Sequence, residues 1–242
     1  FELSPATGGT WVLADLHDFN GSDGAGSTAS DAGGLIGGLI MDASGNLYGT
    51  TGAGGSSTQC ASGCGVVFEL TNSAGTWSET VLHSFSGTDG MNPDAPLLMD
   101  SSGHLYGTTA AGGSGGFGVV FETAFVSGTW QTHVIHNFTN VSGDGAFPNS
   151  ALIMDTAGNL YGTTDAGGGS TNCTVVADNG CGTAFELLRK GETWHELSLH
   201  RFLGKGDGGF PGGLVFGVDG NLYGVATVGG RYNDGLFFEL SP

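Results

Sequence analysis

Basic residues are scarce in this sequence. The 242 residues include five lysines and arginines against 23 aspartates and glutamates, which gives a formal net charge of −18. A charge of that sign repels phosphate backbones and anionic lipid surfaces. Long apolar runs are missing as well, and no stretch approaches the roughly 18 residues that a membrane helix requires. The composition therefore argues against nucleic acid as a partner and against membrane insertion. It leaves glycans, cations and proteins as candidate ligands.

Catalytic and cofactor motifs are also missing. The sequence has no Gly-x-Ser-x-Gly, no His-Glu-x-x-His, no P-loop and no Gly-x-Gly-x-x-Gly ahead of a helical pattern. No segment has a sustained helical period. We therefore predict no organic cofactor, and the sequence leans away from an enzyme.

Cysteines are few, and they fall into two short-range pairs, Cys60 with Cys64 and Cys173 with Cys181. Both pairs lie in the same type of loop, and no histidine follows at the spacing of a zinc finger. We predict a disulfide within each pair, which is typical of an oxidising compartment. A metal site is the alternative, because C-x3-C also occurs around metals.

Glycine is abundant, at 49 residues, and it belongs to an internal repeat. The string Gly-Asn-Leu-Tyr-Gly, with one Asn-to-His change, recurs four times, and a tryptophan, a His-x-Phe pair and a Phe-Glu string recur with it. Such self-similarity indicates a repeat architecture. We predict one repeat domain over 1–242, with units at about 20–85, 86–138, 139–202, and 203–242 joined by 1–19.

Each unit reads as four short strands, a to d, separated by Gly, Asn, Asp and Ser clusters. In strand d of the first unit, Trp77, Glu79, Val81 and His83 alternate with polar residues and Leu82. Four-stranded units of about 60 residues are typical of propeller blades. The sequence therefore predicts an all-β fold: a four-bladed β-propeller of four-stranded antiparallel sheets.

The two ends of the chain carry the same segment, Phe-Glu-Leu-Ser-Pro, at 1–5 and 238–242. The last unit has no strand d of its own, and the N-terminal strand at 11–19 can supply it, which would close the ring and remove a sheet edge. One strand c is then surplus. The alternative is an open stack of β repeats, in which Phe1–Pro5 pairs with a neighbouring copy and causes self-association.

The series DG…P…LxxD…GNLYGTT…GG…GVVFEL…TW…LHxF runs through all four units. It resembles the GloVer-type "choice-of-anchor" tandem-repeat proteins of bacterial surfaces. The Asp-x-x-Gly-Asn-Leu-Tyr part is also similar to NHL-type propeller repeats. The resemblance implies a bacterial protein that is secreted or displayed at the cell surface, and it implies no particular activity.

Most acidic and histidine residues recur in every unit, and we interpret them as scaffold. The His-x-Phe histidines are expected to pack between sheets with one nitrogen bonded to the backbone. The Asp-Gly steps after strand d are the exception, because oxygen-rich loops can hold Ca²⁺. The candidate calcium ligands are Asp23, Asp89, Asp144 and Asp207.

The b–c and d–a loops vary in length, share one face of a propeller, and contain both cysteine pairs. Variable loops on a rigid scaffold often carry binding sites. We predict a ligand site on this face. Its candidate residues are Asp31, Asn92, Asp94, Phe147, Asn149, Asp178, Asn179, Arg231, Tyr232, Asn233 and Asp234.

Three functions fit these features. The first is an extracellular binding or adhesion module for a glycan or a surface protein. The second is a structural subunit of an extracellular array or filament. The third is a polysaccharide hydrolase or lyase that uses loop carboxylates together with His104 or Tyr232.

Overall fold

The computed structural model describes residues 1–25, 37–141, 143–173 and 180–242, and within them the chain is all-β. The one helix in these ranges is a 3-10 turn, η1 (Lys205–Asp207). No helix in the same ranges has the length and apolar character needed to cross a membrane. Three candidate site residues, Asp31, Asp178 and Asn179, lie outside the described residues.

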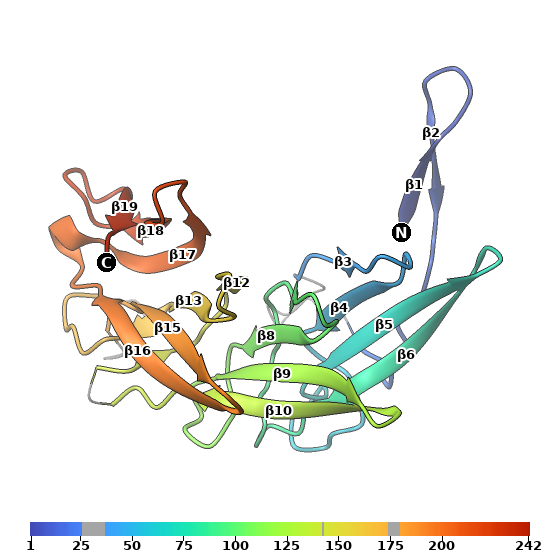
Figure 1. Ribbon diagram of the computed structural model, residues 1–242, viewed down its shortest axis with the longest axis horizontal. Coiled ribbons are helices and arrows are strands. Elements are labelled where there is room, and N and C mark those ends of the chain that lie inside the picture. The colour runs from blue at the N-terminus through green and yellow to red at the C-terminus, as the bar shows by residue number, and fades with distance from the viewer. Residues whose placement is uncertain (26–36, 142, 174–179) are drawn as a thin grey trace.

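Four antiparallel sheets follow one another along the chain and form an arc (Figure 1). The first contains β3 (Ile40–Met41), β4 (Leu47–Thr51), β5 (Val66–Ser73) and β6 (Thr76–Ser84). The second contains β7 (Leu98–Met99), β8 (Leu105–Thr109), β9 (Val119–Val126) and β10 (Thr129–Asn137). The third contains β12 (Ile153–Met154), β13 (Leu160–Thr164), β15 (Thr183–Lys190) and β16 (Thr193–Arg201). The fourth contains β17 (Gly209–Phe216), β18 (Leu222–Val228) and β19 (Leu236–Leu240).

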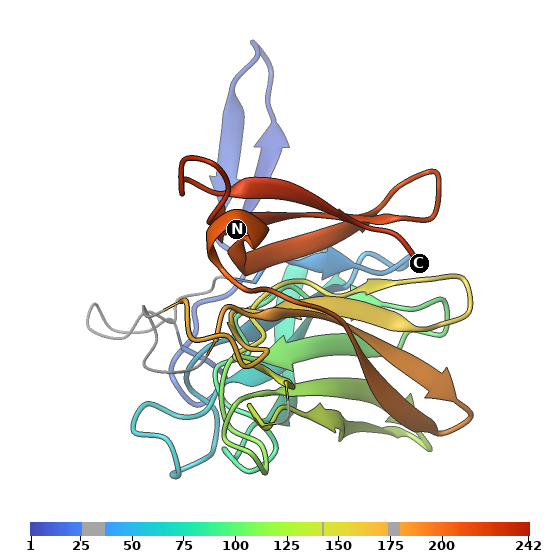
Figure 2. The same cartoon turned by 90° about the vertical axis from the view of Figure 1, so that its left-hand side faces the viewer.

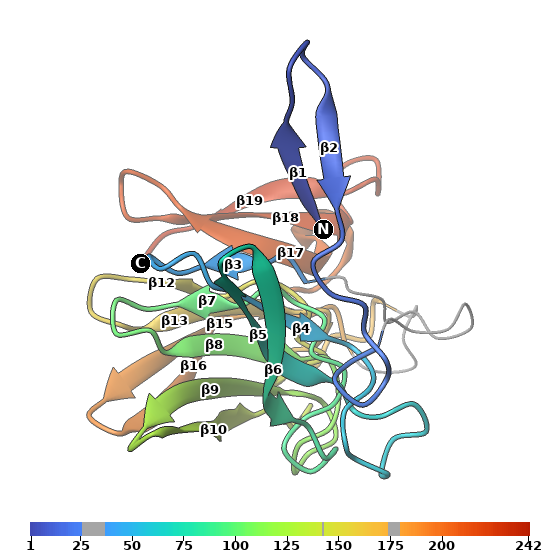
Figure 3. The ribbon, with the colours of Figure 1, turned by 90° about the vertical axis from the view of Figure 1, so that its right-hand side faces the viewer.

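Two small pairings complete the strands: β1 (Glu2–Pro5) with β2 (Trp11–Ala14), and β11 (Gly145–Ala146) with β14 (Ala166–Gly167). The all-β prediction is confirmed. The strands of the first three sheets lie side by side in the expected order a-b-c-d, and the fourth sheet contains a, b and c. The predicted pairing of the N-terminal strand with the last sheet is not observed among the described strands. Strand β2 pairs with β1, and the hairpin projects from the sheets in all three views (Figures 1, 2 and 3).

The β1–β2 hairpin has the register of a c–d hairpin inside a sheet. Pro5 lies opposite Trp11, as Asn72 lies opposite Trp77 in the first sheet. Pairing with β1 closes a short loop, whereas pairing with β19 would join segments more than 200 residues apart, so loop-closure entropy favours the local partner. The hairpin leaves Trp11 64% exposed, and β19 forms the edge of the fourth sheet among the described strands.

The glycine of strand b is required by the phenylalanine of strand c. A Cβ on Gly107 would meet Cζ of Phe121 at 2.6 Å, and the same approach joins Gly49 with Phe68 at 2.7 Å. The far end of each ring therefore packs against the glycine of the neighbouring strand, where any larger side chain would displace it. This contact explains why Leu-Tyr-Gly and Phe-Glu recur together along the chain.

The same phenylalanines join consecutive sheets. Phe85 follows the first sheet and meets Phe121 of the second edge-to-face at 5.1 Å, and Phe138 meets Phe185 of the third at 5.2 Å. All four of these rings are fully buried. Phe19 repeats the arrangement on Phe68 at 5.1 Å. Edge-to-face pairs add to the area that the rings bury, so these contacts form the main core between sheets.

Strand d does not alternate along its whole length. A β-bulge shifts the pairing of β6 with β5 between Val81 and His83, and equivalent bulges interrupt β10 and β16. The bulge turns Leu82 into the core, where it is 8% exposed, although simple alternation places it with the exposed Ser78 and Thr80. His83 and Phe85 still reach the space between two sheets.

The tyrosine of strand b anchors the a–b turn. The Tyr48 hydroxyl lies 2.8 Å from a Glu69 oxygen and 3.2 Å from an Asp42 oxygen. Asp42 also accepts the Ser44 and Asn46 amide protons. Burial, followed by the Glu69 carboxylate, raises the pKa of the Tyr48 hydroxyl, which therefore stays protonated and donates. These repeating acids thus hold the turn, as expected for scaffold.

Candidate functional site

Two of the candidate residues have a backbone role. Asn92 and Phe147 each precede a proline in the d–a connection and adopt a left-handed φ of 57°. The Asn92 amide donates to the Cys64 carbonyl, and its own carbonyl accepts from Ala110 in the next sheet. The Phe147 amide donates in the same way to Phe117. The backbones of these residues therefore connect consecutive repeats.

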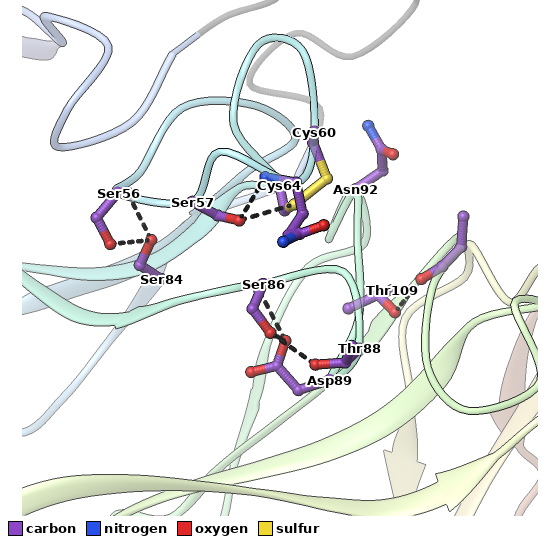
Figure 4. The surroundings of a disulfide bond; sticks show 12 residues. Ser56, Ser57, Cys60, Cys64, Ser84, Ser86, Thr88, Asp89, Asn92 and Thr109 are labelled. Atoms are coloured by element: carbon purple, nitrogen blue, oxygen red, sulfur yellow. Dashed lines mark hydrogen bonds between the residues drawn. A yellow bond between two sulfur atoms is a disulfide. The ribbon is translucent and has the colours of Figure 1, made fainter.

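Both predicted disulfides are present, Cys60–Cys64 and Cys173–Cys181. Each lies against the backbone that follows a strand d. A Cβ built on Gly87 would come within 3.8 Å of the Cys64 sulfur, and one built on Gly204 within 3.1 Å of the Cys181 sulfur. Figure 4 shows Asn92 beside the first disulfide, where its amide bonds to Cys64. The disulfides therefore fix the b–c loops onto the start of the next repeat.

Asn149 and Asp165 form the most polar contact of the loop face. The Asn149 side-chain amide donates to the Asp165 carboxylate at 2.5 Å. Burial raises the pKa of Asp165 to about 6, although the hydrogen bond from Asn149 opposes the shift. The Phe147 carbonyl accepts the Asp165 amide proton, and the Phe147 ring meets Phe117 edge-to-face at 5.6 Å. The backbone of Phe147 thus links the Asn149–Asp165 pair to the segment that carries the two aromatic rings.

Asp165 was not among the predicted site residues, and the sequence contained a signal for it. The position after the paired threonines of strand b is Gly52 in the first repeat and Ala110 in the second, and it becomes aspartate only in the third. A residue that departs from an otherwise regular repeat is a functional candidate. Its burial, which gives the carboxyl group its chemistry, depends on packing between repeats.

Asp94 occupies the place of Asn149 one repeat earlier. Its Oδ1 is buried and has no hydrogen-bond partner among the described residues, and burial raises the pKa of its carboxyl group. Thr108, on strand β8, likewise has a buried hydroxyl without a partner in the described ranges. The second repeat, with Asp94 and Thr108, therefore presents polar groups near strands a and b, as the third repeat does with Asn149 and Asp165.

The Arg231–Asp234 loop forms a separate exposed group. The Arg231 guanidinium lies 5.5 Å from the centre of the Tyr232 ring, which is 77% exposed. Asn233 adopts a left-handed φ of 62° and its amide bonds to Gly230, while Asp234 is exposed. No hydrogen bond among the described residues links this loop to Asn149 or to Asp165.

The four Asp-Gly aspartates lie in four separate places, each beside the His-x-Phe histidine of its own repeat. Asp89 accepts the Ser86 amide and lies 2.9 Å from His83 Nε2. The histidine nitrogen therefore faces a carboxylate, and the prediction of a backbone partner is wrong. The reason is the turn itself, which folds the aspartate back over the end of strand d. The equivalent pairs are His17 with Asp23, His136 with Asp144, and His200 with Asp207.

His104 lies at the opposite end of the strands from the loop face. It precedes strand β8, and its Nδ1 is 3.2 Å from a Glu122 oxygen and 3.4 Å from an Asp100 oxygen. Among the described residues it therefore contacts the anchor of the a–b turn, away from the Asn149–Asp165 pair.

These features define an all-β protein of tandem antiparallel sheets whose loops are fixed by disulfides. Residues 1–176 match the Gloeobacter/Verrucomicrobia repeat, and the chain belongs to this family. No curated protein matches the chain. Among solved structures it is similar to an ulvan lyase of polysaccharide lyase family PL25, solved bound to -[GlcA(1-4)Rha3S]-. That likeness has a TM-score of 0.47 and 11% identity over 85% of this chain, which spans about half (48%) of the lyase chain. It is too weak to support an activity.

Proposed function

We propose that the protein is a secreted or surface-displayed bacterial binding module that recognises a glycan through its loop face. The observation that carries this proposal is the Asn149–Asp165 pair, which a backbone hydrogen bond connects to Phe147 and its ring contact with Phe117. Sugar hydroxyls suit amide and carboxyl groups, and the apolar face of a sugar ring packs on an aromatic side chain. The net charge of −18 favours neutral glycans over anionic ones. The two disulfides fit an oxidising compartment.

The test is a glycan array followed by calorimetry on the best ligand. Asn149→Ala should weaken binding at least tenfold, because it removes the exposed donor of the pair. Asn72→Ala is the matched control: Asn72 accepts the Gly75 amide in the c–d turn, at the other end of the strands. No ligand at millimolar concentration, or equal losses in the two variants, would contradict the proposal.

A polysaccharide hydrolase or lyase is the second candidate, and the pKa of Asp165 favours it. A carboxyl group with a pKa of about 6 can hold or release a proton near neutral pH. Turnover on a polysaccharide that is lost in Asp165→Asn, while binding is retained, would establish this activity. Binding without turnover leaves the module as a lectin-like domain.

The four-bladed ring and self-association share one structural requirement, which is that β2 pairs with β19. The segment Phe1–Pro5 and the segment after Phe237 are identical, so β2 has two partners of the same sequence. The register of β1 with β2 transfers directly and places Leu13 opposite Leu240. We propose this pairing within one chain, which closes the propeller.

Oxidation of a Leu13→Cys, Leu240→Cys variant tests the pairing. A cross-linked monomer supports closure, a cross-linked dimer shows strand exchange between copies, and no cross-link overturns both. A Leu3→Cys, Leu13→Cys variant is the positive control, because these residues lie opposite each other in the hairpin. The native cysteines are already bonded and do not compete.

A further inference from the structure

The four His–Asp pairs between repeats are not equivalent. His83 and His200 are hydrogen-bonded to their aspartates, at 2.9 and 3.2 Å. His17 Nε2 lies 3.3 Å from Asp23, and His136 Nε2 lies 3.7 Å from Asp144, and neither nitrogen has a hydrogen-bond partner among the described residues.

A glutamate on the following sheet separates the two kinds of pair. Glu79 of β6 faces His17 and Asp23, and Glu196 of β16 faces His136 and Asp144. At the corresponding position of the second sheet, strand β10 carries a threonine, Thr132. In the described part of the fourth sheet no strand d is present to face His200. The histidine thus loses its hydrogen bond where a glutamate joins the pair.

Both glutamates also have a buried oxygen without a hydrogen-bond partner in the described ranges. Leaving a buried polar group unpaired is energetically unfavourable. At the first pair, a histidine nitrogen and a glutamate oxygen both lack a partner and lie close together, which indicates a shared ligand that accepts electron pairs from both.

The first cluster has the dimensions of a small metal site. One ligand atom from each of His17, Asp23 and Glu79 lies within 4.8 Å of the other two. In a tetrahedral zinc site with bonds of about 2.1 Å, ligand atoms lie about 3.4 Å apart. The 3.3 Å between His17 Nε2 and Asp23 Oδ2 already matches this spacing. The remaining contraction would involve Glu79, which lies within the 4.8 Å limit of the other two ligand atoms.

Charge separates this cluster from its counterpart in the third sheet. The Arg201 guanidinium lies close enough to Glu196 to interact with it, so a basic side chain already faces the carboxylate there. The five lysines and arginines of the chain all lie at Arg189 or later. Among the described residues, Asp23 and Glu79 form no ion pair with a lysine or arginine, and His17 is the basic side chain beside them.

We propose that His17, Asp23 and Glu79 form a zinc site, with water as the fourth ligand. A nitrogen ligand with two carboxylates suits Zn²⁺, whereas Ca²⁺ takes oxygen ligands. The metal would join the segment that follows the β1–β2 hairpin to strand β6 of the first sheet. Three protein ligands from two segments would fix where the hairpin leaves the sheets.

The test titrates the whole chain with Zn²⁺ against a chromophoric chelator. We expect one tightly bound equivalent, a loss of at least tenfold in affinity in Glu79→Gln, and little change in Glu196→Gln. Zinc should also raise the melting temperature of the unsubstituted chain and of Glu196→Gln, and leave Glu79→Gln unchanged.

Substitution with Co²⁺ gives a readout that needs no variant, because a tetrahedral site with nitrogen and oxygen ligands has a characteristic visible spectrum. Absence of that spectrum, or equal zinc affinity in the two glutamine variants, would overturn the proposal. Displacement of Zn²⁺ by millimolar Ca²⁺ would also overturn it and would favour an oxygen-only site.

Discussion

Replacing Asp165 with asparagine should make the protein more stable at neutral pH. The substitution keeps the shape of the side chain and an oxygen that can accept the Asn149 amide proton, and it removes the ionisable group. Burial raises the pKa of Asp165 from 3.8 to about 6 in the folded chain. The folded state therefore keeps this proton to a higher pH than the unfolded state does.

The sign of the pH dependence follows from this difference. As pH rises from about 4 to about 6, the unfolded chain ionises Asp165 first, so folding becomes progressively less favourable. A shift of about two units corresponds to at most about 3 kcal/mol. Because the carboxyl group is only partly buried, we expect solvent screening to reduce the cost to about 1–2 kcal/mol. Asp165→Asn should recover that amount above about pH 6 and nothing below about pH 4.

Urea unfolding at both pH values measures the effect through the denaturation midpoint at constant slope. Asp155→Asn, in the same repeat, is the control with the opposite sign. Burial acts to raise the pKa of Asp155, but hydrogen bonds from Asn159, Ala157 and Tyr161 outweigh it and lower the pKa. Asp155→Asn should therefore destabilise the chain at neutral pH, and the difference should shrink as pH falls below about 4. A stability gain in Asp165→Asn that does not change with pH would refute the reasoning.

Three further predictions concern the scaffold. Phe121→Ala should cost about 3–5 kcal/mol in unfolding free energy because the ring is fully buried between two sheets, whereas Phe237→Ala, at a position 90% exposed, should change it by less than about 0.5 kcal/mol. Gly107→Ala should lower the melting temperature, because its Cβ would meet the Phe121 ring. Gly103→Ala is the comparison: its Cβ would meet no atom within 4 Å, so any loss there would come from the left-handed φ of Gly103 alone. Reduction of both disulfides should accelerate amide exchange in the 52–64 loop and leave the far-ultraviolet spectrum of the sheets intact; global unfolding on mild reduction would contradict this.

Strand positions could be predicted from the sequence because the same steric requirement recurs in all four repeats. Leu-Tyr-Gly and Phe-Glu must lie side by side, since only glycine leaves room for the ring of Phe121 or Phe68. The bulge in strand d could not be predicted, because alternation alone places Leu82 on the exposed face. Nothing in the local sequence marks a bulge that forms through pairing with β5.

The partner of β2 could not be predicted for a different reason. The two candidate strands carry the same five residues, so side-chain chemistry cannot distinguish them. The choice depends on loop length and on the position of the fourth sheet, both of which are properties of the folded chain. Asn149 was predicted as a site residue, but its partner Asp165 owes its raised pKa to burial that only packing between repeats creates.

Recurrence in every repeat does not by itself show that a residue is structural and has no functional role. The His–Asp pairs recur in every unit, and a rule that excludes recurring residues would exclude all of them. The difference lies in the third residue, which is Glu79 at one place and Thr132 at the corresponding place in the next sheet. One change on a neighbouring strand is enough to turn a hydrogen-bonded pair into a cluster whose buried donors and acceptors are unpaired. Sites in repeat proteins should therefore be sought in combinations across adjacent units, because each member of such a combination can look like scaffold when it is read alone.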